Sequence, residues 1–525
     1  MCKLCDAGKP QDHTRSLKGS QLGRRDFLKA SAATGAAAAG ASFFNSRPAK
    51  ADDGHEAPQD SGRHGRRYVI RGGSVMSMDP AVGDFAEGDV LVEGKKILAV
   101  GQNIQARGAA VIDARGKIVM PGFVDTHHHL FETGLRSFLA DGILVREDPS
   151  VPSINYFEYI LLKFAPVYRP QDVYINSLFG SLAQLDAGVT TTHDISQIHH
   201  SPQHSDAAIK AIMDSGRRAA FGYFESAGGV AGNQYPQDAR RIRKQYFSSD
   251  DQLVTMIMGG EIYLPGYEAA WNIGRELGLP IAAHIVVTFG MAPTFDAIAQ
   301  GKGGDSGTLG FGSDNLFIHM TGMSDMAWEK VRDAGADVSL AVPIEMNMRH
   351  GTPPIVKTLD LKIQPSLSVD VEVTLTADMF TQMRSAMALQ RMFMNGKALG
   401  EPMFAGLPSQ PLLTTRDVLR FATVEGAEDL RLSSKVGTLT PGKEADIIIL
   451  DAEAINVYPV NVVPGAVVSL MERSNVETVI VAGKVRKWKG KLLDVNLGKL
   501  RRELENSRDF IFHAAGVPQD LFRPN

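Results

Sequence analysis

Three consecutive histidines, His127 to His129, follow the apolar run VMPGFVDT and are well suited to bind a metal ion. Side chains two residues apart in a β-strand lie on the same face. His127 and His129 are therefore expected to face together with Asp125, while His128 points to the other face. Two imidazoles at the end of one strand can chelate a single cation, whereas His128 is expected to pack or to form a hydrogen bond.

Three further polar residues lie inside short apolar runs, where an unpaired polar group costs about 1–3 kcal/mol. They are His284 in LPIAAHIVV, His319 in NLFIHM and Asp370 in PSLSVDV. A lone strand histidine is usually a core residue with hydrogen-bond partners, but five such residues at the ends of neighbouring strands indicate one shared site. Imidazoles with one carboxylate and room for water are typical of zinc, with iron and manganese as alternatives.

The elements that must position these residues are eight short apolar runs, which alternate with amphipathic stretches that end in glycine, as helices do. The runs cover residues 119–129, 188–194, 217–225, 253–261, 279–287, 315–320, 336–343 and 365–371. Eight strand–helix units predict a (β/α)₈ TIM barrel of the α/β class. Active sites in such barrels lie at the C-terminal ends of the strands, where the polar residues above are found.

The chain on both sides of the predicted barrel has a different pattern. Residues 67–119 and 436–493 alternate like short antiparallel strands. We expect these two segments to join as a small β-sandwich domain built from both chain ends. The barrel then spans residues 120–435, and a charged helical tail spans residues 494–525.

Residues 1–51 are typical of a twin-arginine signal peptide. Arg24 and Arg25 precede an alanine-rich, weakly apolar segment that ends in an A-x-A cleavage site, although an alanine-rich amphipathic helix is the alternative. Residues 52–66 are polar and without periodicity, so they are expected to form a linker. The predicted partner is the twin-arginine export machinery, which carries folded proteins, and the predicted location is the periplasm or the exterior.

Cleavage of this segment would change the composition of the chain. Residues 1–51 hold nine Lys or Arg and three Asp, so the net charge falls from −4 to −10 without them, and both cysteines are lost. A mildly acidic chain without a basic stripe is not expected to bind nucleic acid. Beyond the signal, no apolar run reaches the roughly 18 residues that a membrane span needs. A thiol-free mature protein suits an oxidising compartment.

The motif PGFVDTHHH, the later single histidines, SVD and the closing VGTLTPGKEADIIIL resemble the amidohydrolase superfamily over roughly residues 67–490. The nearer resemblance is to its cytosine deaminase and atrazine-hydrolase branch. It implies that His319 polarises the scissile group or the water. It also implies one metal ion rather than two, because the run LVTMIMGGE holds no lysine. The metal ligands that the resemblance implies are His127, His129, His284 and Asp370.

The reaction that the resemblance implies is metal-assisted hydrolysis of a small-molecule substrate. A bound cation lowers the pKa of its water from about 16 toward 7. Asp370 would take the water's proton, and His319 would stabilise the developing charge. Deaminases of this branch place a proton-shuttling glutamate three residues after the third metal histidine, but this position is Val287 here.

The valine favours hydrolysis of a non-peptide C–N bond in a small amide, lactam or nitrogen heterocycle. One alternative is a cytosine-deaminase-like aminohydrolase that releases ammonia with the help of another acid. A second alternative, from a different class, is a metal- or ligand-binding barrel without turnover. The sequence identifies neither the substrate nor the oligomeric state, although a homo-oligomer is common among chains with this resemblance.

Several residues are candidates for the role that Val287 cannot fill. Glu345, in VPIEMNMRHG, is a candidate catalytic acid or base, because the segment resembles a subgroup of uncharacterised amidohydrolases with a glutamate at this site. An ordinary loop carboxylate is the alternative reading. Glu225 and Glu261, which end the third and fourth runs, are further candidates.

Other residues could line the pocket. His193 either reaches the pocket or makes a structural hydrogen bond, and four loop histidines could contact substrate: His199, His200, His204 and His350. The insert at residues 136–164 either walls an aromatic-lined pocket or packs as core beneath a long loop. Its aromatic residues include Phe138, Tyr156, Phe157 and Tyr159.

Overall fold

The computed structural model describes residues 56–146, 154–230, 233–249 and 251–522. The predicted signal peptide and the first residues of the predicted linker lie outside these ranges. Residues 57–525 form one compact unit. Within the described ranges, no helix combines the length and the apolar character that crossing a membrane requires.

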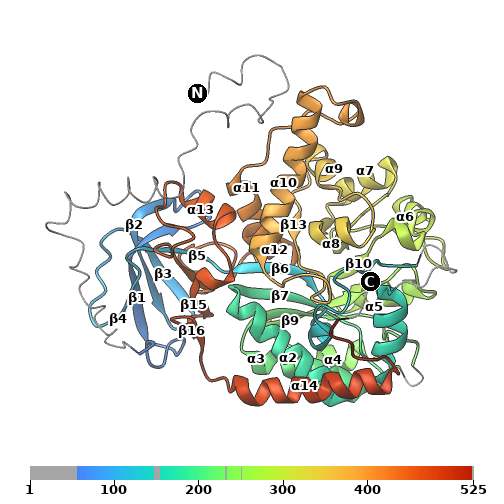
Figure 1. Ribbon diagram of the computed structural model, residues 1–525, viewed down its shortest axis with the longest axis horizontal. Helices are drawn as coiled ribbons and strands as arrows, with labels where there is room; N and C mark the ends of the chain where they lie inside the picture. The colour runs from blue at the N-terminus through green and yellow to red at the C-terminus, as the bar shows by residue number, and fades with distance from the viewer. Residues whose placement is uncertain (1–55, 147–153, 231–232, 250, 523–525) are drawn as a thin grey trace, which may run out of the picture. The chain divides into compact units, whose positions relative to one another are not determined.

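Eight parallel strands form the barrel that holds the predicted site (Figure 1). Neighbours in the barrel are neighbours in the chain, and the last strand returns to the first through the amide of Asp370, which donates to the carbonyl of His127 at 2.9 Å. Each of the eight predicted runs overlaps one barrel strand, so the predicted (β/α)₈ fold is confirmed. The strands are β6 (Phe123–His128), β7 (Val189–Ser196), β8 (Arg218–Tyr223), β9 (Val254–Gly259), β10 (Ile281–His284), β11 (Asn315–Ile318), β12 (Asp337–Leu340) and β13 (Ser366–Leu367).

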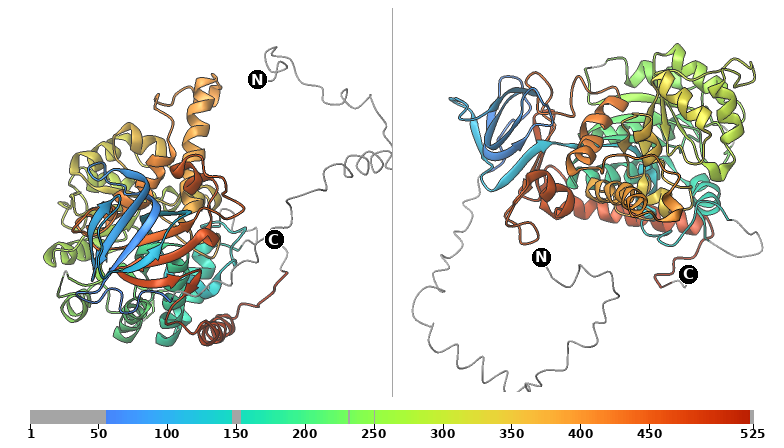
Figure 2. Two further views of the ribbon diagram at one scale, coloured as in Figure 1. Left: turned by 90° about the vertical axis from the view of Figure 1, so that its left-hand side faces the viewer. Right: turned by 90° about the horizontal axis from the view of Figure 1, so that it is seen from above.

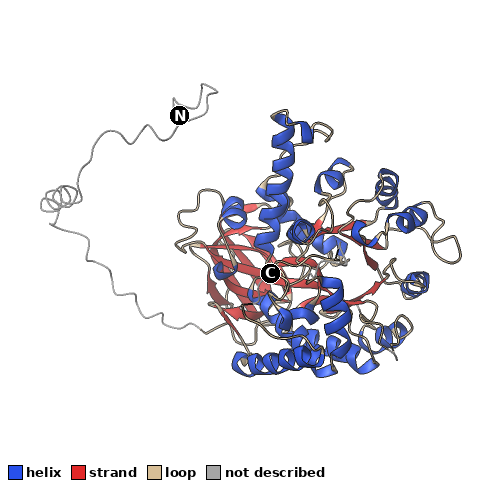
Figure 3. Cartoon of the chain, turned by 45° about the vertical axis from the view of Figure 1, so that its right-hand side comes forward, coloured by secondary structure: helices blue, strands red, loops and turns tan. Residues whose placement is uncertain are grey.

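Helices surround the barrel strands, as Figure 3 shows in blue around red. Gly216 and Gly335 take left-handed conformations at the ends of α3 and α7, as expected for glycines at helix C-termini. The helices are α2 (Pro170–Asp186), α3 (Pro202–Ser215), α4 (Ala239–Tyr246), α5 (Tyr267–Glu276), α6 (Ala292–Ala299), α7 (Asp325–Ala334), α8 (Val342–Asn347), α9 (Ile355–Asp360), α10 (Met379–Ala398), α11 (Thr415–Arg420) and α12 (Gly426–Asp429).

Short 3₁₀ and π helices fill several connections between the longer elements. They are η1 (Leu130–Leu135), η2 (Phe157–Phe164), η3 (Ala165–Val167), η4 (Val287–Phe289), η5 (Pro402–Phe404), η6 (Phe421–Glu425) and η7 (Arg473–Asn475). The π helix η2 lies in the predicted insert. The C-terminal part adds α13 (Val463–Ser469) and α14 (Leu497–Ala514), and α14 packs against α2 through a hydrogen bond from Asn176 to Ser507. The helix α14 lies within residues 494–525, the segment expected to form a charged helical tail.

Beneath the site, buried apolar side chains from β6 to β11 form one cluster. On the side of β12 and β13, the buried hydroxyl of Thr126 instead contacts those of Ser339 and Ser366. Parallel strands in a barrel are buried on both faces, so both faces favour apolar residues. The apolar cluster includes Val124, Ile195, Ala220, Ile257, Ala282, Leu316 and Ile318.

A second sheet is built from both chain ends, as predicted. Figure 2 shows its N-terminal strands in blue beside its C-terminal strands in red. The two ends meet where β5 pairs with β14, and all nine strands belong to one continuous mixed sheet rather than to two separate ones. The strands are β1 (Arg67–Met76), β2 (Asp84–Glu93), β3 (Lys96–Gly101), β4 (Ala110–Asp113), β5 (Lys117–Pro121), β14 (Ile447–Asp451), β15 (Val476–Val481), β16 (Lys484–Trp488) and β17 (Lys491–Leu492).

A buried ion-pair cluster ties the barrel to this sheet. Arg218, the first residue of β8, is fully buried and donates to Asp446 at 2.8 Å and to Glu444 at 2.6 Å. Both acids precede β14. The guanidinium therefore neutralises two carboxylates at the junction of the two sheets.

We expect Arg218→Ala to destabilise the fold by about 3–5 kcal/mol, because it removes the buried guanidinium that pairs with Asp446 and Glu444. Of these two carboxylates, Glu444 then keeps only the more exposed Lys95 and Lys96 as ion-pair partners among the described residues. Chemical denaturation followed by circular dichroism measures the change. Arg240→Ala, which removes a surface pair with Glu276, is the matched control and should leave the unfolding midpoint unchanged. Equal, small effects of the two substitutions would contradict the stabilising role of this cluster.

Candidate metal centre

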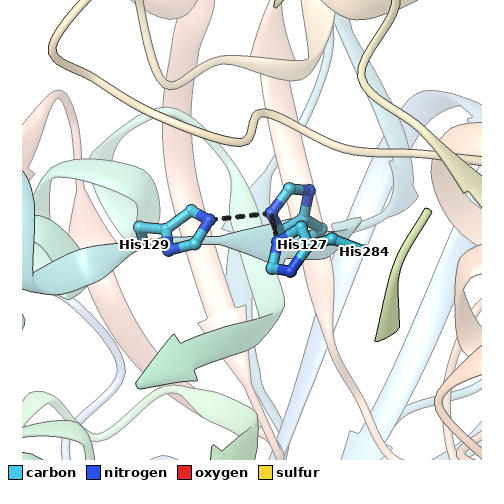
Figure 4. Close-up of side chains that lie close together, drawn as sticks. All are labelled: His127, His129 and His284. Carbon is cyan, nitrogen blue, oxygen red and sulfur yellow. Dashed lines mark hydrogen bonds between the residues drawn. The ribbon is translucent and has the colours of Figure 1, made fainter. Parts of the chain in front are cut away.

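Three imidazoles from two strand ends point at one another, as Figure 4 shows. The Nε2 atom of His127 lies 3.0 Å from Nε2 of His129 and 2.9 Å from Nε2 of His284. Asp370 completes the group, with Oδ1 3.4 Å from Nε2 of His127 and 3.5 Å from Nε2 of His129. The four side chains that the sequence suggested as metal ligands therefore lie together at the C-terminal ends of β6, β10 and β13.

The residues present fit a single divalent ion. Ligand atoms about 2.1 Å from a tetrahedral zinc ion lie about 3.4 Å from one another. The observed separations of 2.9–3.5 Å are close to that value. Burial, together with the neighbouring His284, lowers the pKa of His127 and of His129 well below the ordinary value. Both imidazoles are thus neutral, which is the form that binds a metal.

A β-bulge in β6 places Asp125 and His127 on different faces of the strand. The pairing with β7 shows a register shift between Asp125 and His128. The expectation that Asp125 shares the face of His127 is therefore wrong. Asp125 lies instead beside His128, 3.5 Å from its Nδ1 atom, and accepts a hydrogen bond from Gln184 of α2 at 2.5 Å.

Two site residues have strained backbones at the ends of their strands. His319 and Asp370 have φ angles of +71° and +70°, a left-handed conformation that costs a non-glycine residue about 1–3 kcal/mol. Hydrogen bonds hold both: the amide of His319 donates to Ser339 at 2.9 Å, and the carbonyl of Asp370 accepts from His129 at 2.9 Å. Strain that the surroundings maintain is common where side chains must point into a site.

Asp370 also contacts the residue that was predicted to act on the substrate. Its Oδ2 atom lies 3.5 Å from Nε2 of His319. Burial raises the pKa of Asp370 to about 7, although His284 and His128 partly oppose this. A carboxylate with a pKa near neutrality is suited to accept and release a proton.

A carboxylate behind each of two site histidines fixes its orientation. Glu261 accepts hydrogen bonds from Nδ1 of His284 at 2.6 Å and from its backbone amide at 3.2 Å. Glu345 accepts from the amide of Ala341 at 2.9 Å and lies 3.1 Å from Nδ1 of His319. Both carboxylates are buried, and neither lines the pocket. The geometry gives both glutamates positions suited to orient histidines.

We expect Glu261→Gln to weaken metal affinity by about 10–100-fold, as loss of a hydrogen-bonded partner of a metal ligand typically does. The amide cannot hold the His284 ring through a charge-assisted bond. Competition with a coloured zinc chelator measures the affinity. Glu276→Gln, on the exposed face of α5, is the control, and equal affinities for the two variants would contradict the role of Glu261.

A small pocket lies beside the histidines and is lined mostly by apolar and aromatic groups. Among the described residues, no lysine or arginine lines it. Val286 lines this pocket, but Val287 does not: its side chain is 40% exposed and packs beside Gly322 and Gly351. The other lining residues that are not part of the metal group are Leu144, Tyr156, Leu161, Gln197, Tyr263, Phe289, His319, Met348, His350 and Val371.

The other candidate histidines divide into two groups. His350 lines the pocket, 4.8 Å from the ring of His319. The loop histidines His199, His200 and His204 each have both ring nitrogens within hydrogen-bond distance of a serine hydroxyl or a backbone carbonyl, so their role is structural. His193 lies below the site, where its Nδ1 atom contacts the carbonyl of Thr126 at 3.0 Å.

The insert at residues 136–164 contributes both to the pocket wall and to the core, the two alternatives that its sequence suggested. Tyr156 lines the pocket, and its hydroxyl donates to the buried Glu132 at 2.5 Å. Phe138 packs in the core against Phe164 and Phe512. Sequence reasoning did not identify Glu132, Gln197 or Tyr263, because nothing in their local pattern separates them from other polar loop residues.

Comparison with known proteins agrees with this geometry. Residues 118–486 match the model of the amidohydrolase family, and residues 21–41 match the model of the twin-arginine translocation signal. A 5'-deoxyadenosine deaminase from Methanosarcina mazei is 28% identical over 428 residues, covering 79% of this chain and 92% of the relative. A 5-methylthioadenosine/S-adenosylhomocysteine deaminase from Desulfitobacterium hafniense is 25% identical over 464 residues, covering 85% and 98%.

Solved structures share the fold. An adenosine deaminase from Xanthomonas campestris with bound zinc superimposes with a TM-score of 0.69 at 20% identity, covering 86% of this chain and 99% of that one. An atrazine chlorohydrolase from Arthrobacter aurescens, complexed with zinc and atraton, gives 0.69 at 19% identity, covering 85% and 100%. The family match spans well over half of the sequence and includes every residue of the metal group. The chain therefore belongs to the amidohydrolase family and is a metal-dependent hydrolase of carbon–nitrogen bonds.

Proposed function

We propose that this protein hydrolyses a C–N bond of a small, uncharged amide, lactam or nitrogen heterocycle with one divalent ion, for which zinc is the expected metal. The observation that carries the proposal is the convergence of three imidazoles and one carboxylate, of which His129, His284 and Asp370 line an apolar pocket. A pocket without lysine or arginine among its described lining residues offers no partner for a phosphate or carboxylate.

The residues have distinct roles in this proposal. His127, His129, His284 and Asp370 hold the metal, whose chemistry is to lower the pKa of a bound water toward 7. Asp370 accepts the water's proton on Oδ2, the oxygen that faces His319, while Oδ1 faces His127 and His129. Gln197 and His350 present polar groups to the substrate from the pocket wall.

His319 is proposed to polarise the group under attack, with Glu345 as its partner. Burial raises the pKa of Glu345 well above its ordinary value, and burial and His350 lower that of His319. Both shifts favour the neutral form of each group. When the Glu345 carboxyl donates to Nδ1, the Nε2–H of His319 points toward Asp370 and the pocket as a hydrogen-bond donor. Glu345, the candidate acid from the sequence, then acts through His319 rather than on the substrate.

Deamination is the second candidate, because the two curated relatives described above are named deaminases. A deaminase releases ammonia, whereas an amide or lactam hydrolase releases an amine or a ring-opened acid. The two reactions are therefore separated by their products.

The test uses the mature protein, residues 52–525, purified with zinc. It is incubated with neutral anilides, lactams and heterocycles, including 5'-deoxyadenosine, and the products are identified by mass spectrometry and an ammonia assay. We expect an amine or a ring-opened acid, and we expect chelation to stop the reaction. Ammonia as the sole product would favour the deaminase. If metal-loaded protein hydrolyses none of these substrate classes, the proposed hydrolytic function would be contradicted.

We also propose the periplasm as the working location, since the signal directs folded proteins out of the cytoplasm. Cell fractionation separates a periplasmic protein from one released to the medium.

A further inference from the structure

A buried carboxyl group lies behind the pocket on the side of β8, β9 and β10. Glu225, two residues after the end of β8, is 6% exposed. Its Oε1 atom accepts from Nε2 of Gln197 at 2.6 Å and from the hydroxyl of Tyr263 at 2.7 Å. Both donors line the pocket. Its Oε2 atom is buried and meets no hydrogen-bond partner in the described part of the chain.

A second carboxyl group favours the protonated form of Glu225. Glu261 lies nearby but directs its own oxygen to the two N–H groups of His284. Two neighbouring carboxylates in a buried site cannot both be ionised at low cost. Burial and Glu261 accordingly raise the pKa of Glu225 to about 7, and burial raises that of Tyr263 well above its ordinary value. Glu225 can thus hold a proton, and Tyr263 remains a phenol.

Tyr263 lies in the same sector of the barrel as Val287. Its ring stacks on Phe289 with 5.5 Å between the ring centroids, and Phe289 is two residues after Val287. Tyr263 and Phe289 both line the pocket, whereas the side chain of Val287 does not. The phenol therefore offers an O–H group on the side of the pocket where residue 287 provides none.

We propose that Tyr263 is the general acid that protonates the leaving nitrogen, and that Glu225 is its proton source. This inference rests on the proposed hydrolytic function. The hydroxyl group of Tyr263 can change from hydrogen-bond donor to acceptor across its 2.7 Å contact with Glu225. Once Oε1 of Glu225 carries a proton, the carboxyl donates to the phenol oxygen and leaves the phenolic hydrogen free to point into the pocket.

The step balances in atoms and charge. Water adds its oxygen to the carbonyl carbon and gives one proton to Asp370. The C–N bond then breaks and its electron pair stays on nitrogen. The phenolic proton of Tyr263 passes to this nitrogen, and the carboxyl proton of Glu225 passes to the phenol oxygen. The proton on Asp370 returns to Glu225 through solvent before the next turnover, so the products are one acid and one amine.

Leaving-group dependence tests the role of Tyr263. The probes are acetanilide and 4-nitroacetanilide, which release amines of very different basicity, with zinc-loaded protein. Tyr263→Phe keeps the ring stack but removes the proton, so we expect kcat on acetanilide to fall by about 10²–10³-fold. The loss on 4-nitroacetanilide should be much smaller, because that amine leaves without prior protonation. Glu225→Gln should show the same pattern.

Tyr156→Phe is the matched control, since Tyr156 is the other pocket phenol that donates to a buried glutamate. It should affect the two anilides equally. Zinc content and unfolding temperature should match the parent protein in all variants. Equal losses on both anilides with Tyr263→Phe would show a structural role only and would overturn the proposal.

Infrared spectroscopy gives a readout that needs no turnover. At pH 6 the zinc-loaded protein should show the C=O band of a buried protonated carboxyl group, which Glu225→Gln removes and Tyr263→Phe shifts. An ionised Glu225 at this pH would overturn the proposal even if anilides are hydrolysed. If neither anilide is hydrolysed but the band behaves as expected, Glu225 is still the proton store, and the failure lies with the proposed hydrolytic function.

Discussion

Asp370→Asn is expected to lower the hydrolysis rate by about 10²–10⁴-fold, the contribution typical of a positioned general base. The substitution keeps the size of the side chain and leaves an oxygen that can face His127, but the amide cannot take a proton from water. The rate constant kcat, measured with excess zinc on the best substrate of the panel, reports the loss. Excess zinc separates the loss of the base from weaker metal binding.

Asp194→Asn is the matched control for this substitution. Asp194 is also buried, and burial raises its pKa to about 7. It lies outside the pocket lining, and its Oδ1 atom accepts from the amide of Leu130 at 3.2 Å, a role that asparagine can keep. The control should retain its rate. Asp370→Asn with a rate within about tenfold of the parent would show that another group takes the proton.

His127→Ala is expected to remove nearly all bound metal. The Nε2 atom of His127 lies within 3.4 Å of a ligand atom on each of the other three residues, so His127 contacts every other member of the group. The proposed ligands His129, His284 and Asp370 would remain, with the position of His127 left open. Elemental analysis of the purified variant measures the loss, and the gain in unfolding temperature that excess zinc gives the parent should vanish.

His199→Ala controls for the loss of any buried imidazole. His199 is buried and contacts Ser205 and Ser196, so the variant should be less stable but should bind metal normally. Metal content of His127→Ala equal to that of the parent would contradict the proposed ligand set.

The sequence was sufficient to predict the barrel and the clustering of His127, His129, His284 and Asp370, because both depend on local pattern. Eight apolar runs predict eight buried strands, and five polar residues at the ends of such runs indicate one shared site, although a single one would not. The position of Asp125 was not predictable in this way. A bulge depends on how β6 pairs with β7, so alternation along one strand does not reveal it.

The roles of the residues around the proposed metal ligands could be assigned only from the structure. Glu261 and Glu345 were recognised as candidate acids, but only the tertiary fold shows that each contacts a histidine. Tyr263 and Gln197 come from loops whose composition does not encode a pocket. Val287 was predicted to lack a function that a glutamate would have, and the structure adds that its side chain does not line the pocket.

The metal content of the mature protein tests the central claim most directly. The protein, residues 52–525, is purified without chelator and analysed for zinc, iron and manganese, with His127→Ala beside it. We expect about one metal ion per folded chain, with zinc favoured by the ligand set, and a large loss of metal in the variant. Folded protein that holds no metal would contradict the account, and two ions per chain would contradict the single-metal site.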